Sequence, residues 1–191
     1  NGVYPPSSAR LHGRSSIQRV IYAAYSKDLS VKTTSAKIQM MKQGKYVGGY
    51  AAYGYVLHPS IRNKLAVDPE AADVIRRIFR EALEGSNSSQ IARSLNDDGI
   101  QTPGQYFKNK HPDKKKFSNM SEKISWETVM VYNILKNLVY TGTLVSRKMK
   151  SCGVGSKKRV VNEPIIVEGT HEAIISKEDF ELAQKVIRGG G

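Results

Sequence analysis

The sequence predicts an α+β fold that is mainly α-helical, with a long N-terminal helix followed by a helix-turn-helix-like domain that carries small β-hairpins. The long helix is indicated by about 30 residues, from Arg14 to Gln43, that include neither proline nor glycine. Four later segments repeat apolar residues at helical spacing, and short runs between them alternate as strands do. We therefore expect a lead-in and long helix over residues 1–44, a domain over 45–188, and a linker or tag over 189–191.

The composition is that of a soluble protein with a polyanionic partner. The 191 residues include 30 Lys and Arg against 17 Asp and Glu, which gives a net charge of +13 and a pI of about 9.8. A chain this basic usually meets nucleic acid or an anionic membrane surface. No run of about 18 apolar residues indicates a membrane span, and no secretory signal is visible. We therefore expect a cytoplasmic protein.

The single cysteine and the charge distribution narrow the possibilities further. Cys152 alone excludes an intramolecular disulfide and a cysteine-based zinc site. Residues 1–64 hold ten bases and one acid, whereas residues 65–100 hold four bases and seven acids. Separate basic segments favour a scaffold whose contact surfaces come from different parts of the chain. Because the sequence begins at Asn1 rather than Met, we expect it to be a piece of a longer protein.

The long helix has only a broken apolar stripe. Asp28 and Ser35 interrupt it, so the helix is not expected to pack along its whole length. Two interpretations remain open: an ordinary solvated helix, or a helix that lies against a phosphate backbone. Gly44 is expected to end it as a C-cap glycine. The apolar positions of the stripe are Ile17, Ile21, Ala24, Val31 and Ile38.

A hairpin and a well-marked helix are expected next. Tyr53–Leu57 alternates like a strand and is predicted to pair with Leu65–Val67. In the helix that follows, Asp68 suits the N-cap, Pro69 suits the first position, and Gly85 ends the segment. The predicted buried face of this helix is Val74, Ile75, Ile78, Phe79, Ala82 and Leu83, with an ion pair expected between Asp73 and Arg77.

The next helix is short and is followed by a long connection. Asn87 and Gln90 suit a capping box, and Ile91, Ala92 and Leu95 give a short inner face. About 25 residues then separate this helix from the next periodic segment, where a simple helix-turn-helix motif has only a few. The connection is either a solvated charge run or a basic loop that reaches phosphates. Its lysines are Lys108, Lys110, Lys114, Lys115, Lys116 and Lys123.

The segment ISWETVMVYNILKNLVYTG, from Ile124 to Gly142, predicts a helix with two different faces. Val131, Ile134, Leu135 and Leu138 form the buried stripe. Rotation by about 100° per residue places Val129, Asn133 and Lys136 on the opposite side, flanked by Met130 and Tyr132. This outer face offers a methyl surface, an amide, a phenol and an ammonium group. These are groups that the edge of a DNA base pair can accept.

The C-terminal part predicts a hairpin and a last helix. Residues 142–150 read as a strand, and a Gly/Ser-rich tip leads into a second strand-like run, so that the hairpin tip is very basic. Ser176 suits the cap of a helix that is expected to cover the sheet. The covering residues are predicted to be Phe180, Leu182, Ala183, Val186 and Ile187.

These residues carry a family resemblance. Trp126 to Gly142 has the spacing W-x4-V-x2-I-L-x-N-x2-Y-x-G, and it follows the YGY of Tyr53–Tyr55, DPEAADVIRRIF and IARSLNDDGIQTP. In this order the motifs resemble the recombinase domain of large serine recombinases, which are phage integrases and transposases of mobile elements. The segment before YGY is similar to the long helix that joins the catalytic domain to this domain. The resemblance covers about residues 24–187.

The resemblance implies that the chemistry lies elsewhere. In that family a serine of an N-terminal domain attacks the DNA phosphodiester, and a cysteine-rich zinc ribbon follows the recombinase domain. We expect both parts to be missing here, and we assign no catalytic residue, no metal and no cofactor to this chain. The implied partner is double-stranded DNA, without a membrane or a small-molecule substrate. Dimers or tetramers are expected only for the full-length protein, which is bacterial or phage-encoded.

The resemblance also assigns the contacts. The candidate base-contacting residues are Thr128, Val129, Tyr132, Asn133 and Lys136, with Asn133 suited to adenine and Val129 to a thymine methyl group. A solvated basic tip remains an alternative for the C-terminal hairpin. The candidate phosphate contacts are Lys37, Lys42, Lys45, Lys148, Lys150, Lys157, Lys158 and Arg159.

Two other classes of protein remain open. One is a stand-alone helix-turn-helix transcription regulator, which would bind DNA as a dimer without a nuclease domain. The other is a basic RNA-binding or ribosome-associated protein. The reading frame upstream of Asn1 would separate the first class from a recombinase, and a preference for duplex DNA over structured RNA would separate the second.

Overall fold

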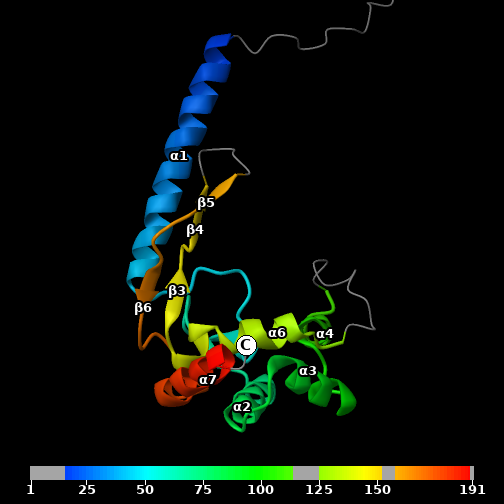
Figure 1. Cartoon of the computed structure of the whole chain (residues 1–191). Helices are drawn as coiled ribbons and strands as arrows, with labels where there is room; N and C mark the ends of the chain where they lie inside the picture. The colour runs from blue at the N-terminus through cyan, green and yellow to red at the C-terminus, as the bar shows by residue number, and fades with distance from the viewer. Residues whose placement is uncertain (1–15, 114–124, 152–157, 190–191) are drawn as a thin grey trace, which may run out of the picture.

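The structure is a computed structural model that describes residues 16–113, 125–151 and 158–189. Within these ranges a helical base carries two projections, helix α1 and a β-hairpin (Figure 1). The helices are α1 (Ser16–Lys42), α2 (Pro69–Leu83), α3 (Ser88–Asp97), α4 (Pro103–Lys110), α6 (Thr128–Leu135), the 3-10 turn η1 (Leu138–Thr141) and α7 (Lys177–Gly189). The mainly helical α+β prediction is confirmed.

The strands form antiparallel pairs. β1 (Tyr55–Leu57) pairs with β2 (Leu65–Val67), as the sequence predicts. β3 (Leu144–Ser146) pairs with β6 (Ile165–Val167), and β4 (Met149–Ser151) pairs with β5 (Arg159–Val161). The predicted C-terminal hairpin therefore exists. Each of its arms, however, is two short strands rather than one. The first arm is interrupted at Arg147, which has a positive φ of 57°, and the second between Val161 and Ile165.

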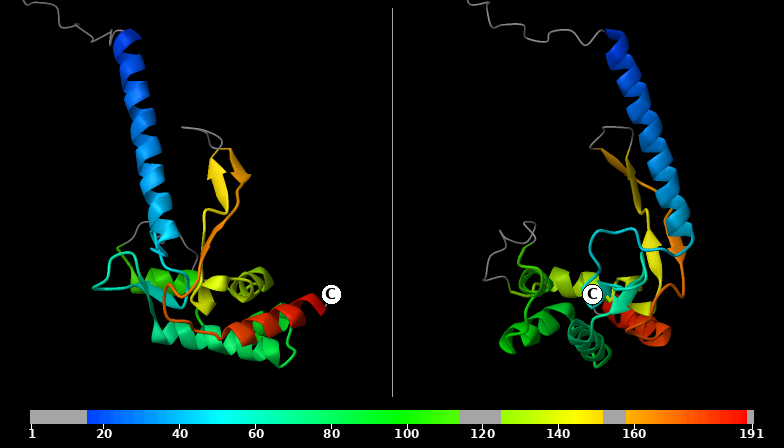
Figure 2. Two further views of the ribbon diagram at one scale, coloured as in Figure 1. Left: turned by 90° about the vertical axis from the view of Figure 1, so that its left-hand side faces the viewer. Right: turned by 180° about the vertical axis from the view of Figure 1, so that it is seen from behind.

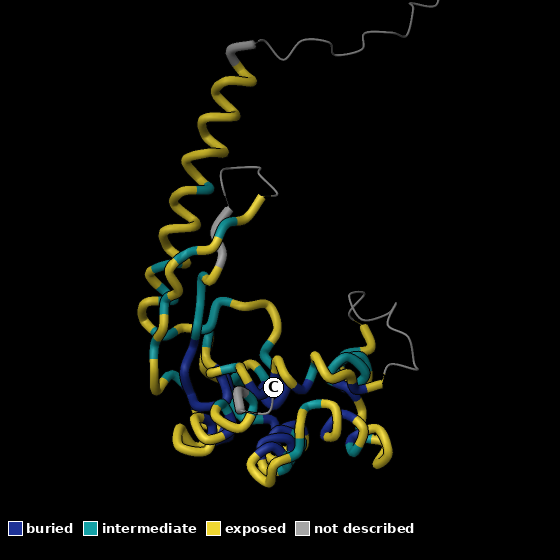
Figure 3. The backbone as a smooth tube through the Cα atoms, in the orientation of Figure 1, coloured by how far each residue is buried: buried dark blue, intermediate teal, exposed yellow. Residues whose placement is uncertain are grey.

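Helix α1 stands away from the base, and it is exposed along nearly all of its described length (Figure 3). Its apolar residues Val20, Ile21 and Tyr25 are more than half exposed, which agrees with the broken stripe in the sequence. Gly44 ends the helix with a φ of 69°. A Cβ at Gly44 would lie 2.7 Å from Thr170 Cγ2, so the foot of α1 sits directly on the segment after β6.

The core lies in the base, around α2. Ile75, Ile78 and Phe79 are fully buried, and Phe79 packs against Phe180 of α7 with ring centroids 5.9 Å apart. Tyr55 of β1 stacks on Tyr140 with centroids 6.2 Å apart. One hydrophobic cluster therefore joins the hairpin, α2, α7 and the segment after α6.

Several predictions about α2 and α7 were wrong in detail. Asp73 pairs with Arg76 at 2.6 Å, while Arg77 turns towards α3 and binds Glu81 at 2.7 Å and Asp98 at 2.5 Å. Arg77 therefore ties α2 to α3. The face of α2 is narrower than predicted, since Leu83 is exposed.

Helix α7 covers α2 rather than the sheet. Phe180 and Ala183 are buried against the base, while Leu182 and Val186 are exposed. The predicted Ser176 cap is present, because Asp179 N donates to Ser176 Oγ at 3.0 Å.

The long connection after α3 contains helix α4, where the sequence was interpreted as a solvated run or a loop. Thr102 and Gln105 form a capping box at its start. Asp68 makes no cap hydrogen bond to α2. Its buried carboxylate instead accepts hydrogen bonds from Tyr106 Oη at 2.9 Å and Lys110 Nζ at 2.6 Å. Burial lowers the pKa of the Lys110 ammonium, but its hydrogen bonds to Asp68 and to Tyr106 Oη raise that pKa above its ordinary value. Residues 114–124 lie outside the described part of the chain.

Candidate nucleic-acid interface

Trp126 fixes the start of α6 to the end of α3. Its backbone N donates to Asn96 Oδ1 at 2.7 Å, and Asn96 Nδ2 donates back to the Trp126 carbonyl at 3.0 Å. The buried indole Nε1 donates to the Ile100 carbonyl at 2.9 Å. Three hydrogen bonds therefore fix the start of α6, and with it the direction of the helix, relative to the end of α3.

The inner face of α6 locks the helix against the base. Val131, Ile134 and Leu135 are buried, and α6 packs against α3 along this face. The helix ends at Leu135, with Lys136 as its C-cap, so the predicted stripe is one residue too long. Leu138 is the first residue of η1 and is 36% exposed. Because α6 has already ended, Leu138 does not continue the buried stripe.

The remaining residues of the Trp126–Gly142 motif also have structural roles. The Asn137 side chain caps η1 by accepting from Val139 N at 3.3 Å. Tyr140 is buried beside Tyr55. Gly142 has a φ of 77°, and a Cβ there would lie 2.8 Å from the His171 carbonyl oxygen. Every named position of the motif therefore holds the fold together, and none faces outward.

The positions between the motif residues form the outer face of α6. Thr128, Val129, Tyr132, Asn133 and Lys136 are all exposed, and Val129 is 53% exposed. Tyr132 is the partly covered one, at 38% exposed, because it lines a pocket with Ser86 of the α2–α3 turn and Val186 of α7. The Lys136 ammonium lies 4.3 Å from the centroid of the Tyr132 ring and donates to the Tyr132 hydroxyl. The exposed Glu127 precedes the helix as its N-cap.

The predicted phosphate contacts lie on the two projections. Lys37 and Lys42 are exposed on the lower half of α1, and Lys45 is exposed just after it. Lys148 is exposed between β3 and β4, and Lys158 and Arg159 are exposed at the start of β5. Lys157 lies outside the described residues, and only the backbone of Lys150 is described. Both projections rise from the same side of the base (Figures 1 and 2).

Sequence reasoning missed the residues that fix the loops beside this surface. Asn63 has a φ of 62°, donates through Nδ2 to the Tyr46 carbonyl at 2.7 Å and accepts from Tyr46 N at 2.7 Å, which closes the β1–β2 hairpin onto the foot of α1. Asn162 links the two arms of the C-terminal hairpin in a similar way, because its Nδ2 donates to the Arg147 carbonyl on the opposite arm. The only sequence signal is the asparagine itself, which tolerates turns and left-handed backbone. Arg147 gave no such signal.

His171 holds the loop before α7 against η1. Its Nε2 lies 2.8 Å from the Val139 carbonyl, which can only accept, so Nε2 carries the proton. Its Nδ1 lies 2.7 Å from Thr170 Oγ1. Burial lowers the pKa of the His171 imidazole below its ordinary value of 6.5. The ring is a structural partner of Tyr55, whose ring centroid is 4.8 Å away.

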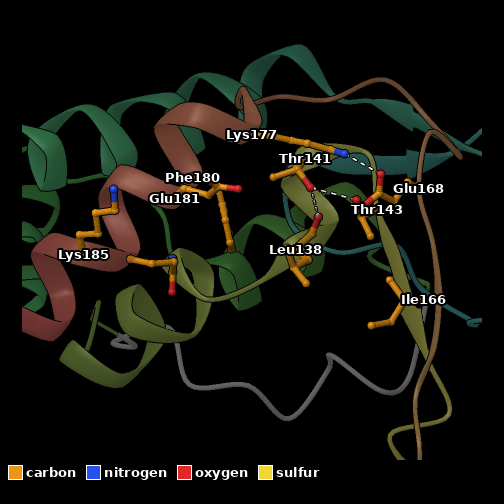
Figure 4. A pocket seen from close by; sticks show the side chains of 10 residues that line it. Leu138, Thr141, Thr143, Ile166, Glu168, Lys177, Phe180, Glu181 and Lys185 are labelled. Atoms are coloured by element: carbon orange, nitrogen blue, oxygen red, sulfur yellow. Dashed lines mark hydrogen bonds and ion pairs between the residues drawn. The ribbon is translucent and has the colours of Figure 1, made fainter.

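A cleft of about 560 Å³ opens between η1, the β3–β6 pair and α7 (Figure 4). Its polar groups serve the fold: Thr141 Oγ1 donates to the Leu138 carbonyl at 2.8 Å, and Lys177 pairs with Glu168 at 2.6 Å. Across the described ranges, no cluster of three metal-ligating side chains occurs. None of the described helices is long and apolar enough to cross a membrane.

Helices α3 and α6 pack against each other and the outer face of α6 is exposed, although α4 lies between them in the sequence. Residues 69–190 match the Recombinase family, which is more than half of the 191 residues, and the chain belongs to this family. Uncharacterized protein YefB of Bacillus subtilis (strain 168) is 31% identical over 94 residues, covering 48% of this chain and 28% of YefB.

Two solved structures share the fold. One, described as "Sequence Requirements of the Listeria innocua prophage attP site", has a TM-score of 0.54 at 19% identity, covering 82% of this chain and 51% of the other. The second, described as "Crystal Structure of a LSR-DNA Complex", has a TM-score of 0.51 at 19% identity, covering 83% of this chain and 38% of the other. The chain thus spans about half or less of the length of these proteins.

Proposed function

We propose that this chain is a duplex-DNA-binding domain that recognises recombination attachment sites. The observation that carries the proposal is the exposed outer face of α6, at whose centre Val129 and Asn133 are exposed while Val131, Ile134 and Leu135 on the opposite face are buried. Membership of the Recombinase family and the fold shared with a recombinase–DNA complex support it. The net charge of +13 supports a polyanionic partner.

In this proposal α6 enters the major groove and reads base edges. An α-helix fits that groove, where the adenine edge pairs with a carboxamide and the thymine methyl group accepts an apolar contact. Asn133 would take the first role and Val129 the second. Thr128 and Tyr132 add hydroxyl groups at the same surface, and Lys136 adds a cation at its end.

The two projections would supply contacts that do not depend on sequence. Lysine and arginine side chains on phosphates position a protein on the duplex without specifying bases. The exposed cations of α1 and of the C-terminal hairpin suit this role because both projections rise from one side of the base. The residues assigned are Lys37, Lys42, Lys45, Lys148, Lys150, Lys157, Lys158 and Arg159.

We further propose that the full-length protein is a site-specific serine recombinase. The strand-cleaving serine would lie outside this chain, which spans only part of its relatives. The described serine pair Ser88–Ser89 begins α3, where Ser89 N donates to Asn87 Oδ1 as part of a helix cap. A dimer or tetramer would form in the full-length protein. This chain alone would bind but not cut.

Selection from a random duplex pool, followed by sequencing of the bound fraction, tests the proposal. We expect one enriched duplex sequence, which Asn133→Ala then binds less tightly while random duplex is unaffected. Tighter binding to structured RNA than to any duplex would favour the RNA-binding class instead. Equal losses of Asn133→Ala on enriched and random duplex would remove Asn133 from the reading surface.

A further inference from the structure

The β4–β5 pair is a two-stranded ribbon that extends beyond the base. Among the described residues, neither strand pairs with any strand other than its partner. Its register places Met149 opposite Val161 and Ser151 opposite Arg159. Isolated ribbons of this size are marginally stable in water. A ribbon that nevertheless keeps a defined direction needs support at its base.

That support is a joint between the two strand pairs. Arg147 adopts a φ of 57°, a left-handed conformation that is unfavourable for a non-glycine residue. Asn162 N donates to the Lys148 carbonyl at 3.0 Å. The Asn162 side chain donates through Nδ2 to the Arg147 carbonyl at 3.2 Å and to the Glu163 carbonyl at 2.7 Å. Irregularities of this kind redirect a strand pair, and here one side chain holds the new direction.

The sequence of the ribbon and its joint is basic, and one apolar side chain of β5 is exposed. Residues 143–162 include six Lys and Arg and no Asp or Glu. Arg159 is exposed, and Val161 is 82% exposed, the highest value among the exposed large apolar residues of the described chain. A single exposed valine is common on protein surfaces. Val161 lies at the end of β5 nearest the joint, and it shares one face of the strand with Arg159. A groove that is lined by phosphates and has apolar atoms on its floor would suit both side chains.

We propose that the β4–β5 ribbon is a second DNA-reading arm, which enters a groove beside the base pairs contacted by α6. A two-stranded β-ribbon fits the major groove as an α-helix does. Val161 contacts apolar atoms of the groove, Arg159 contacts a phosphate, and Asn162 is a positioning residue that aims the ribbon. This inference rests on the proposed function, because the arm extends the duplex segment that α6 selects.

Two duplexes test the arm: the long one carries the enriched site with its flanks, and the short one ends at the base pairs protected by α6. Val161→Glu should weaken binding to the long duplex by about tenfold and leave the short duplex nearly unchanged. Ile166→Glu is the matched control, because Ile166 is also an exposed strand residue, at 54%, and receives the same charge. It should bind both duplexes nearly as the unmodified chain does.

Hydroxyl-radical footprinting tests the joint. With Asn162→Ala we expect protection of the flank to weaken while the protection due to α6 remains, a change that general destabilisation would not produce. Equal effects of Val161→Glu and Ile166→Glu, or a footprint without flank protection in the unmodified chain, would overturn the arm. Failure of the proposed function is recognised separately, since then no duplex is enriched and Asn133→Ala has no effect.

Discussion

The two faces of the Trp126–Gly142 segment differ in what they contribute. On the inner face Trp126, Val131 and Leu135 are at most 3% exposed and are fixed by packing and hydrogen bonds. On the outer face Val129 and Asn133 contact solvent. The residues of the motif on which the family resemblance rests are those of the inner face. The motif therefore marks the scaffold of the domain, while the surface that we propose to read DNA lies at the positions between the motif residues.

The largest expected effect comes from breaking the inner face. Trp126→Ala should lower the free energy of unfolding by about 3–5 kcal/mol, because it removes a buried ring. Trp126→Phe keeps a ring but leaves the Ile100 carbonyl without its donor, and it should cost about 1–3 kcal/mol. Urea denaturation measures both. Val129→Ala on the outer face is the control. A comparable loss of stability in that variant would contradict the conclusion that only the inner face stabilises the fold.

Breaking the outer face should affect binding and not folding. Asn133→Ala should weaken binding to the enriched sequence by about 1–3 kcal/mol, since an unpaired adenine edge loses two hydrogen bonds. Titration of labelled duplex measures the loss, and urea denaturation should give an unchanged midpoint. Asn109→Ala, at an exposed position on α4, is the matched control and should bind normally.

The contribution of α1 is expected to be smaller and independent of sequence. Lys42→Ala should weaken enriched and random duplex alike and reduce the slope of log K against log salt by about 1. Lys32→Ala is the control on the same helix, because Lys32 already pairs with Asp28 at 2.7 Å. A selective loss on the enriched duplex would move Lys42 from the positioning contacts to the reading surface.

The smallest expected effect is a pH dependence of stability that comes from His171, which holds the loop before α7 against η1. Burial lowers the pKa of His171 in the folded state, so the unfolded chain binds a proton more readily. The contribution of His171 is complete above its ordinary pKa of 6.5 and is lost as the pH falls through the lower folded value. Thermal unfolding from pH 7.5 to about pH 5 should show this loss. His171→Gln should flatten the dependence and His111→Gln should not.

Much of the fold could be predicted because it depends on local signals. The capping box of Asn87 and Gln90, the C-cap at Gly44 and the buried stripe of α6 all follow from residues within a few positions of one another. The outer face of α6 followed from the same helical period. The position of its residues on the surface is observed, while their contacts with bases remain predictions.

The rest depends on contacts between distant segments. Asp68 has the position of a helix cap, but its carboxylate binds Tyr106 and Lys110, about 40 residues away. Helix α4 itself begins with a local capping box, Thr102 and Gln105, which could have been recognised in the sequence. Arg77 pairs with Glu81 one turn further along α2 and with Asp98, the C-cap of α3, rather than with Asp73. The break at Arg147 depends on Asn162, which lies on the opposite arm of the hairpin. No local pattern encodes these partners.

The seat of α1 at Gly44 has a mechanical consequence. The 27 residues of α1, at about 1.5 Å each, make a lever roughly 40 Å long. The helix is supported at Gly44, whose lack of a side chain leaves room for Thr170. A tilt of about 10° at Gly44 would carry the far tip about 7 Å sideways. The direction of the far end of α1 therefore depends on how closely Gly44 packs against Thr170 and Val167.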